Sequence, residues 1–181
     1  VSIDAPKRGT FDRQIAAPAQ IRYRLALDCN GNGACFDYSP DHIMCPSSKV
    51  TRDRVHSPKG RAGVMREWLR RLSVLESNPI PKDTSMYSAA LGMPRRWLNA
   101  RLKKADFSHD VFRAMEGCLS CKACATECPV KVDIPAMKSE FLAAYHTRYP
   151  RRLRDYLVGA LESAAHLGSR LPRGMLALAK T

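Results

Sequence analysis

The sequence predicts a mainly α-helical fold in which irregular, cysteine-bearing loops connect the helices. Apolar residues recur at helical spacing in several segments, and no segment shows the strict apolar–polar alternation of a half-buried strand. The seven cysteines gather in two stretches that also carry glycine and proline, which favour loops. A hydrophobic fraction of 45% over 181 residues is sufficient for a packed core.

The N-terminal segment, residues 1–25, is predicted to be an extended connector, because it contains two prolines and a glycine and has no sustained period. A cysteine-bearing loop follows. The first long helix is expected to begin where Ser57 can act as the N-cap and Pro58 can occupy the first helical position. The apolar stripe of this helix consists of Val64, Met65, Trp68, Leu69, Leu72 and Leu75.

Shorter helices are expected further along the chain. Helical spacing recurs over residues 97–102 and again over residues 153–164. Ser108 is a candidate cap for a helix that Gly117 ends, and Asp133 is a candidate cap for the helix after it. Four aromatic residues fit core-facing stripes of these helices: Trp68, Trp97, Phe141 and Tyr145.

The most specific motif in the chain is GCLSCKACATECPVKVDIPA, residues 117–136. Its cysteines are separated by two, two and three residues and are followed by proline, as in the bacterial ferredoxin run C-x2-C-x2-C-x3-C-P. Zinc more often takes two separated pairs, and four cysteines within eleven residues are too crowded for two unstrained disulfides. The motif therefore predicts an α-helical ferredoxin-like domain with a 4Fe–4S cluster on Cys118, Cys121, Cys124 and Cys128.

A second, less regular group of cysteines lies upstream. It comprises Cys29, Cys35 and Cys45, and proline again follows the last cysteine. Gly31 and Gly33 allow the backbone to adopt positive φ and to approach a cluster closely. This group is therefore a candidate for a second iron–sulfur centre.

The cysteine count leaves the nature of that second centre open. Two 4Fe–4S clusters need eight thiolates, and the chain has seven. The alternatives are one cluster beside three ordinary thiols, a 3Fe–4S centre, or a cluster completed by His42, His56, an aspartate or a residue outside this chain. Two-cluster ferredoxins also exchange their fourth ligand, so Cys45 and Cys128 are candidates to trade places.

The formal charge of +13 comes from basic residues spread along the chain, without a basic–aromatic platform for nucleic acid. We therefore expect solvated basic faces and contacts with acidic partner domains, not with nucleic acid. Lys59 and Arg61 stand at a helix N-terminus, where the dipole disfavours cations, so a nearby anion would suit them; solvation is the alternative. Lys122 and Lys131 are either potential-raising neighbours of a cluster or screened surface charges.

No run of 18 apolar residues occurs, so no segment is expected to span a membrane. The cysteine pattern without a signal peptide favours metal ligation in a reducing, cytoplasmic compartment, and a peripheral position at the inner face of the membrane stays open. The chain begins without methionine and stops inside an apolar helical pattern. We expect it to be a fragment of a longer polypeptide.

The iron–sulfur half of large bacterial FAD-linked oxidases resembles two stretches of this chain, CNGNGACFDYSPDHIMCPSSKVTRDRVHSPKGRAGVMREWL and GCLSCKACATECPVKVDIPAMKSEFLAAYHTRYP. That family is similar to D-lactate dehydrogenases, and the nearest branch is the D-2-hydroxyglutarate dehydrogenase type. The resemblance covers roughly residues 4–150. It implies that Cys118, Cys121, Cys124 and Cys128 are cluster ligands.

The resemblance also implies a domain organisation and an activity. A flavin domain would precede the connector of residues 1–25, residues 26–149 would form the ferredoxin-type domain, and residues 150–181 would lead to a C-terminal domain. Hydride from a D-2-hydroxy acid would go to FAD upstream, and this part would relay single electrons to a quinone, a cytochrome or an electron-transfer protein. The chain is thus expected to be part of an oxidoreductase with its flavin domain as partner; homo-oligomers stay open.

Two other classes remain as alternatives. One is the iron–sulfur subunit of a glycolate oxidase or of a glycerol-3-phosphate dehydrogenase-like complex. The other is a non-redox module, stabilised by a structural cluster or zinc, that docks a partner protein. Metal analysis and EPR after reduction discriminate between redox and zinc classes, because zinc gives no EPR signal.

Overall fold

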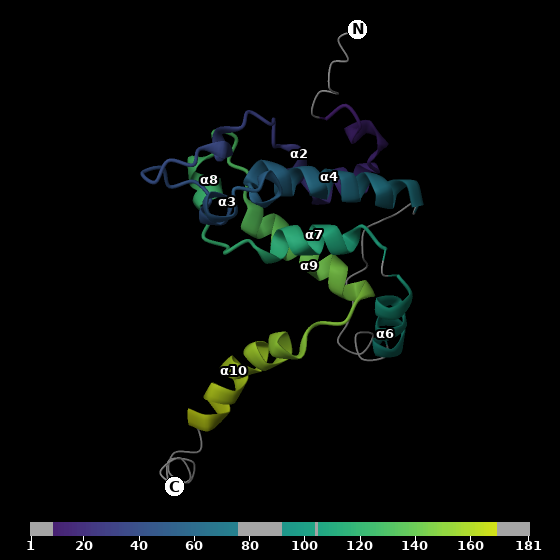
Figure 1. Cartoon of the computed structure of the whole chain (residues 1–181). Coiled ribbons are helices and arrows are strands. Elements are labelled where there is room, and N and C mark those ends of the chain that lie inside the picture. The colour runs from purple at the N-terminus through teal and green to yellow at the C-terminus, as the bar shows by residue number, and fades with distance from the viewer. Residues whose placement is uncertain (1–8, 76–91, 104, 170–181) are drawn as a thin grey trace.

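Three helices form the centre of the molecule: α4 (Pro58–Leu75), α7 (Ser108–Glu116) and α9 (Ile134–Arg148), which pack on one another (Figure 1). The structure, a computed structural model, describes residues 9–75, 92–103 and 105–169. Within these ranges the regular elements are helical and no strand occurs, so the predicted mainly α fold is confirmed.

The other described helices lie around the central three or lead away from them. In Figure 1, α3 and α8 lie near the end where α4 begins, and α10 leads away from the central helices. The remaining described elements, in chain order, are the 3-10 helix η1 (Asp12–Gln14), α1 (Ala17–Arg22), α2 (Arg24–Leu27), the 3-10 helix η2 (Ala34–Phe36), α3 (Pro46–Thr51), the 3-10 helix η3 (Arg54–His56), α6 (Met93–Leu102), α8 (Ala123–Glu127) and α10 (Leu153–Ser169).

Trp68 of α4 lies at the centre of the core, as its place in the apolar stripe predicts. Its ring meets those of Tyr23 and Phe141 edge to face, with centroids 5.7 and 5.1 Å away. Its indole N–H donates to the Ser108 hydroxyl at 3.0 Å, so the buried polar group is satisfied. The same bond joins α4 to the first residue of α7.

The expectation of an extended connector over residues 1–25 is wrong for the part that the structure describes. η1 and α1 form there, and Ile15, Ala19 and Tyr23 are buried in the core. The Ala16 N–H donates to the Ser73 hydroxyl of α4 at 2.9 Å. Pro18 does not prevent a helix here, because it lies in the first turn of α1, where a helix tolerates proline.

Most of the predicted helix ends are confirmed. The Ser57 hydroxyl accepts from the Gly60 N–H at 3.0 Å, and the Asp133 carboxylate accepts from the Ala136 N–H at 3.0 Å. Gly117 ends α7 as its C-cap. Ser108 is instead the first residue of α7, since its hydroxyl is engaged by the Trp68 indole.

Two of the predicted apolar stripes, over residues 97–102 and 153–164, lie on the surface. Residues 153–169 form α10, which confirms the helix predicted there; residues 170–181 lie outside the described ranges. However, Leu153, Leu157 and Leu161 of α10 are exposed. Trp97 was expected in the core and is 57% exposed on α6. Across the described helices, none combines the length and apolar character needed to cross a bilayer.

Candidate metal centre

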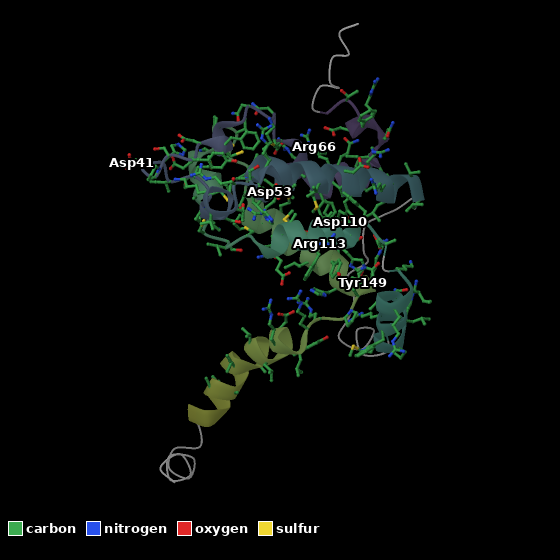
Figure 2. The ribbon with its side chains drawn as sticks, viewed as in Figure 1. Asp41, Asp53, Arg66, Asp110, Arg113 and Tyr149 are labelled. Atoms are coloured by element: carbon green, nitrogen blue, oxygen red, sulfur yellow. The ribbon has the colours of Figure 1, made fainter. Side chains whose placement is uncertain are left out.

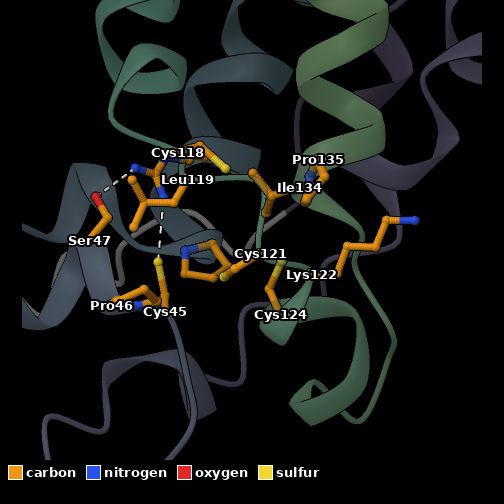
Figure 3. Close-up of a pocket in the computed structure, with 12 residues that line it drawn as sticks. Cys45, Pro46, Ser47, Cys118, Leu119, Cys121, Lys122, Cys124, Ile134 and Pro135 are labelled. Carbon is orange, nitrogen blue, oxygen red and sulfur yellow. Dashed lines mark hydrogen bonds between the residues drawn. The ribbon is translucent and has the colours of Figure 1, made fainter.

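The cysteines line two cavities that meet at the first turn of α4. We call the first pocket the cavity lined by Cys45, Cys118, Cys121 and Cys124 (Figure 3). The second pocket is lined by Cys29, Cys35 and Cys128. Pro58 forms part of the wall of both. The two sites are therefore immediate neighbours.

The structure does not gather the four cysteines of the ferredoxin run around one site. Cys128 lies in the second pocket, and Cys45 takes its place in the first. The physical reason is α8, which carries the chain away from the first pocket before Cys128 follows as an extended C-cap with ψ 126°. The pocket linings thus separate Cys128 from Cys118, Cys121 and Cys124, an arrangement that resembles the ligand exchange of two-cluster ferredoxins. That these cysteines bind a cluster stays a prediction.

In the loop of the first pocket, residues with left-handed φ alternate with residues of ordinary φ. Ser120 and Lys122 adopt left-handed φ values of 57° and 62°, on either side of Cys121. Left-handed conformations are uncommon for residues other than glycine, and each costs about 1 kcal/mol or more. The alternation turns the thiols of the loop toward one cavity. The Lys138 ammonium of α9 donates to the Cys118 carbonyl at 2.7 Å and holds the loop on the central helices.

Arg61 of α4 is buried beside the first pocket, with only 1% of its surface exposed. Its Nη1 lies 3.5 Å from the Cys45 sulfur, its Nη2 donates to the Ser47 hydroxyl at 3.0 Å, and its Nε donates to the Ala114 carbonyl at 2.8 Å. Figure 3 shows the first two of these bonds. None of these partners is a carboxylate. A buried guanidinium without a counter-charge is energetically costly, so an anion in the pocket would stabilise it.

The donor set and the charges fit an iron–sulfur cluster. Burial raises the pKa of Cys124 to about 11 and also raises that of Cys35, so bare thiolates are disfavoured in both pockets. Metal ligation deprotonates cysteine and reverses this preference. A four-thiolate cluster carries a charge of about −2 when oxidised, and the single positive charge of Arg61 would compensate about half of it.

The spread of the thiols also suits a cluster. Among the residues that the structure describes, no three His, Cys, Asp or Glu side chains come close enough to share a single metal ion. The thiols instead lie around the first and second pockets. A cuboidal cluster presents its irons at separate corners, so its ligands need not converge on one point.

The start of α4 also supports the second pocket. The Lys59 backbone N–H points at the Cys35 sulfur at 3.4 Å, and the Lys59 ammonium donates to the Gly31 carbonyl at 2.7 Å. About two turns further on, Arg66, labelled in Figure 2, donates to the Ala26 and Cys29 carbonyls, both at 2.9 Å. The segment HSPKGRAG therefore holds the backbone around both cavities, and its two cations are not simply solvated.

Gly60 lets this segment fold against η3. A Cβ atom at Gly60 would lie 2.0 Å from the Arg54 carbonyl oxygen and 2.8 Å from the Val55 Cα. Such approaches are possible only for glycine. Gly60 therefore fixes where η3 meets the first turn of α4, the turn whose Pro58 lines both pockets.

The pockets differ in exposure. Cys121 is exposed and its neighbour Leu119 is 71% exposed, so the first pocket reaches the surface. Cys29 and Cys35 are only 8% and 9% exposed, so the second pocket lies deeper on that side. Neither His42 nor His56, which the sequence left open as ligands, lines the second pocket.

The sequence predicted the cysteines and left two features of the site open. It grouped Cys128 with its sequence neighbours and kept the exchange of Cys45 and Cys128 as an alternative, because both are followed by proline. For Arg61 it left a nearby anion and solvation as alternatives, and the burial of Arg61 contradicts solvation. Lys122 and Lys131 are both exposed, and both adopt left-handed φ in the cysteine segment.

Residues 25–132 match the 4Fe–4S dicluster domain family, and the chain belongs to this family. A domain of this class binds iron–sulfur clusters, which agrees with two cysteine-lined pockets.

Curated relatives extend the match to nearly the whole chain. It is 48% identical over 181 residues to the D-2-hydroxyglutarate dehydrogenase of Escherichia coli (strain K12), covering 96% of this chain and 18% of that protein. It is 47% identical over 178 residues to the enzyme of the same name from Pantoea ananatis (strain AJ13355), covering 95% and 17%. The Pseudomonas putida (strain KT2440) enzyme is 49% identical over 158 residues, covering 86% and 16%. This chain thus spans less than a fifth of these relatives' length. No solved structure matches it.

Proposed function

We propose that this chain is the iron–sulfur electron-relay part of an FAD-dependent D-2-hydroxy-acid dehydrogenase of the D-lactate or D-2-hydroxyglutarate type. The observation that carries the proposal is the pair of adjacent cysteine pockets, with a buried guanidinium beside the first. The relatives named D-2-hydroxyglutarate dehydrogenase support the substrate class. FAD would bind in another part of the same polypeptide.

In the first pocket, Cys45, Cys118, Cys121 and Cys124 would hold a 4Fe–4S cluster. When bound, such a cluster supplies a one-electron donor and acceptor whose structure changes little on reduction. The protein tunes this chemistry by burial, charge and hydrogen bonds to sulfur. Arg61 supplies the charge and a hydrogen bond to the Cys45 sulfur.

The arrangement of the pockets supports a relay with an exit at the first pocket. Pro58 forms a shared wall, so two bound centres would be close neighbours. The buried cation beside the first pocket favours the more negative, reduced form of a cluster there. Leu119, Cys121 and Lys122 are exposed at its mouth, where an acceptor such as a quinone, a cytochrome or an electron-transfer protein can approach.

The direct test is the iron and acid-labile sulfide content of the full-length protein, purified anaerobically. The proposal expects iron and sulfide in both pockets and an EPR signal after dithionite reduction. Zinc in place of iron, or paired thiols, would contradict it and favour the docking-module alternative. Anaerobic addition of D-2-hydroxyglutarate, D-lactate, glycolate or glycerol 3-phosphate then identifies the class of substrate that reduces the flavin and the iron–sulfur centres.

Removing the clusters is expected to destabilise the helical domain. Anaerobic chelation would leave Arg61 buried without its counter-charge, at a cost of about 3 kcal/mol. The measurement is denaturant unfolding followed by circular dichroism, with and without cluster. The matched control is Arg61→Met, in which cluster removal should cost less. An equal loss in both proteins would show that the cation and the cluster do not stabilise each other.

A further inference from the structure

The second pocket repeats the loop of the first with one thiol missing. Both loops place two cysteines six positions apart, Cys29 with Cys35 and Cys118 with Cys124. Aligned in this way, the middle position is occupied by Cys121 in the first loop and by Asn32 in the second. Each middle residue is exposed.

The backbones of the two loops confirm this alignment. Ser120 and Lys122, which flank Cys121, have φ of 57° and 62°. The equivalent residues that flank Asn32 are glycines, with φ of 78° and 85°. A short helix begins at the next residue in both cases, α8 after Lys122 and η2 after Gly33. The two loops therefore have the same alternating conformation, and the asparagine occupies the position of a ligand.

Asn32 is engaged with its own loop. Its side-chain oxygen accepts from the Ala34 backbone N–H at 3.1 Å, and its backbone N–H donates to the Asn30 side-chain oxygen at 3.1 Å. The second pocket is otherwise lined, besides its three cysteines, by Asn30, Gly31, Gly33, Pro58, Lys59, Val130 and Val132. Within the described residues, this lining offers no fourth thiolate, imidazole or carboxylate.

We propose that the second pocket takes a 3Fe–4S cluster on Cys29, Cys35 and Cys128, with the missing iron corner at Asn32. A 3Fe–4S cluster takes one protein thiolate on each iron, so the three thiolates of this pocket match its three irons. The seven cysteines then divide as four and three, and none is left over. This inference rests on the proposed function in that both pockets must bind iron and sulfide, and it departs from a family of paired 4Fe–4S clusters.

The test uses the full-length protein, isolated anaerobically without added oxidant. An oxidised 3Fe–4S cluster is paramagnetic, whereas a 4Fe–4S cluster in its ordinary oxidised form gives no EPR signal. We expect an EPR signal before any reductant is added, with about seven irons and about eight sulfides per chain. A silent oxidised protein with about eight irons would overturn the inference and leave the proposed function standing, whereas a protein without iron would overturn both.

A substitution at the missing corner makes the test specific. Asn32→Cys should abolish the oxidised-state signal and raise the iron content from about seven to about eight, because the variant restores the fourth thiolate. Asn30→Cys in the same loop is the matched control and should leave both readouts unchanged. An undiminished signal in Asn32→Cys would overturn the inference.

The source of the signal is tested by two more variants. Cys35→Ala should remove the oxidised-state signal, since it removes a ligand of the second pocket. Cys121→Asn should instead add a second signal of the same type, because it gives the first loop the sequence pattern of the second. A signal that survives in Cys35→Ala belongs to the first pocket and would overturn the assignment.

Discussion

Replacing Arg61 by methionine is expected to lower the reduction potential of the first-pocket centre by about 59 mV, a tenfold change in a one-electron equilibrium. Reduction adds a negative charge to a cluster, and the Arg61 Nη1 lies 3.5 Å from the Cys45 sulfur. A buried cation at this distance stabilises the added charge more than an exposed one would. Methionine keeps a similar length but offers neither charge nor hydrogen bonds. The measurement is an EPR-monitored redox titration of the full-length protein.

Two variants control for effects other than the charge. Arg61→Lys keeps the cation and should retain most of the potential. Arg71→Met removes a cation from the same helix, where the Arg71 side chain is 52% exposed and lines neither cysteine pocket. Its loss should leave the potential unchanged, because solvent and salt screen it. If Arg61→Met had the wild-type potential, Arg61 would not be the counter-charge of the cluster.

Gly60→Ala is expected to destabilise the domain by about 3 kcal/mol. The added methyl group would lie 2.0 Å from the Arg54 carbonyl oxygen, and this neighbour is backbone that cannot swing away. η3 and the first turn of α4 must separate to admit it, and both pockets share the wall at Pro58. Thermal unfolding followed by the visible iron–sulfur absorbance measures the effect directly.

Gly159→Ala is the matched control for that substitution. Gly159 also lies within a helix, α10, but a Cβ atom there would have no neighbour within 4 Å among the residues that the structure describes. Alanine has the higher helix propensity, so this variant should be neutral or slightly stabilising. Equal stability of Gly60→Ala and Gly159→Ala would show that the contact of η3 with α4 does not hold the site together.

Local signals predicted much of the fold correctly. The stripe of α4 apart from Leu75, which is 79% exposed, is correct, as are the cap at Ser57, the cap at Asp133 and the end of α7 at Gly117. Each of these features depends on residues within one or two turns. Burial was harder, because it depends on which elements meet. Trp97 has the spacing of a core residue and lies on the surface, whereas the proline-containing segment around Ala19 is helical and buried.

For the candidate site too, the sequence predicted the local features better than those that depend on tertiary structure. Spacing identified the cysteines of the ferredoxin run, since a cluster needs ligands close together in sequence. Their division between two pockets depends on where α8 and α3 direct Cys128 and Cys45, and the shared C-P endings indicated it only as an alternative. The position of Arg61 at a helix N-terminus left a nearby anion and solvation as alternatives, and only tertiary structure shows its burial.

Cys45 lies in the first pocket and Cys128 in the second, so Cys45 and not Cys128 should be the fourth ligand of the first cluster. The iron content of cysteine variants tests this most directly. In a background that lacks the second-pocket ligands Cys29 and Cys35, the full-length protein should keep the first cluster, with about four irons per chain. Adding Cys128→Ala to that background should leave the iron content unchanged, whereas adding Cys45→Ala should remove the cluster. The opposite result, with iron lost on removal of Cys128 and retained without Cys45, would contradict the account.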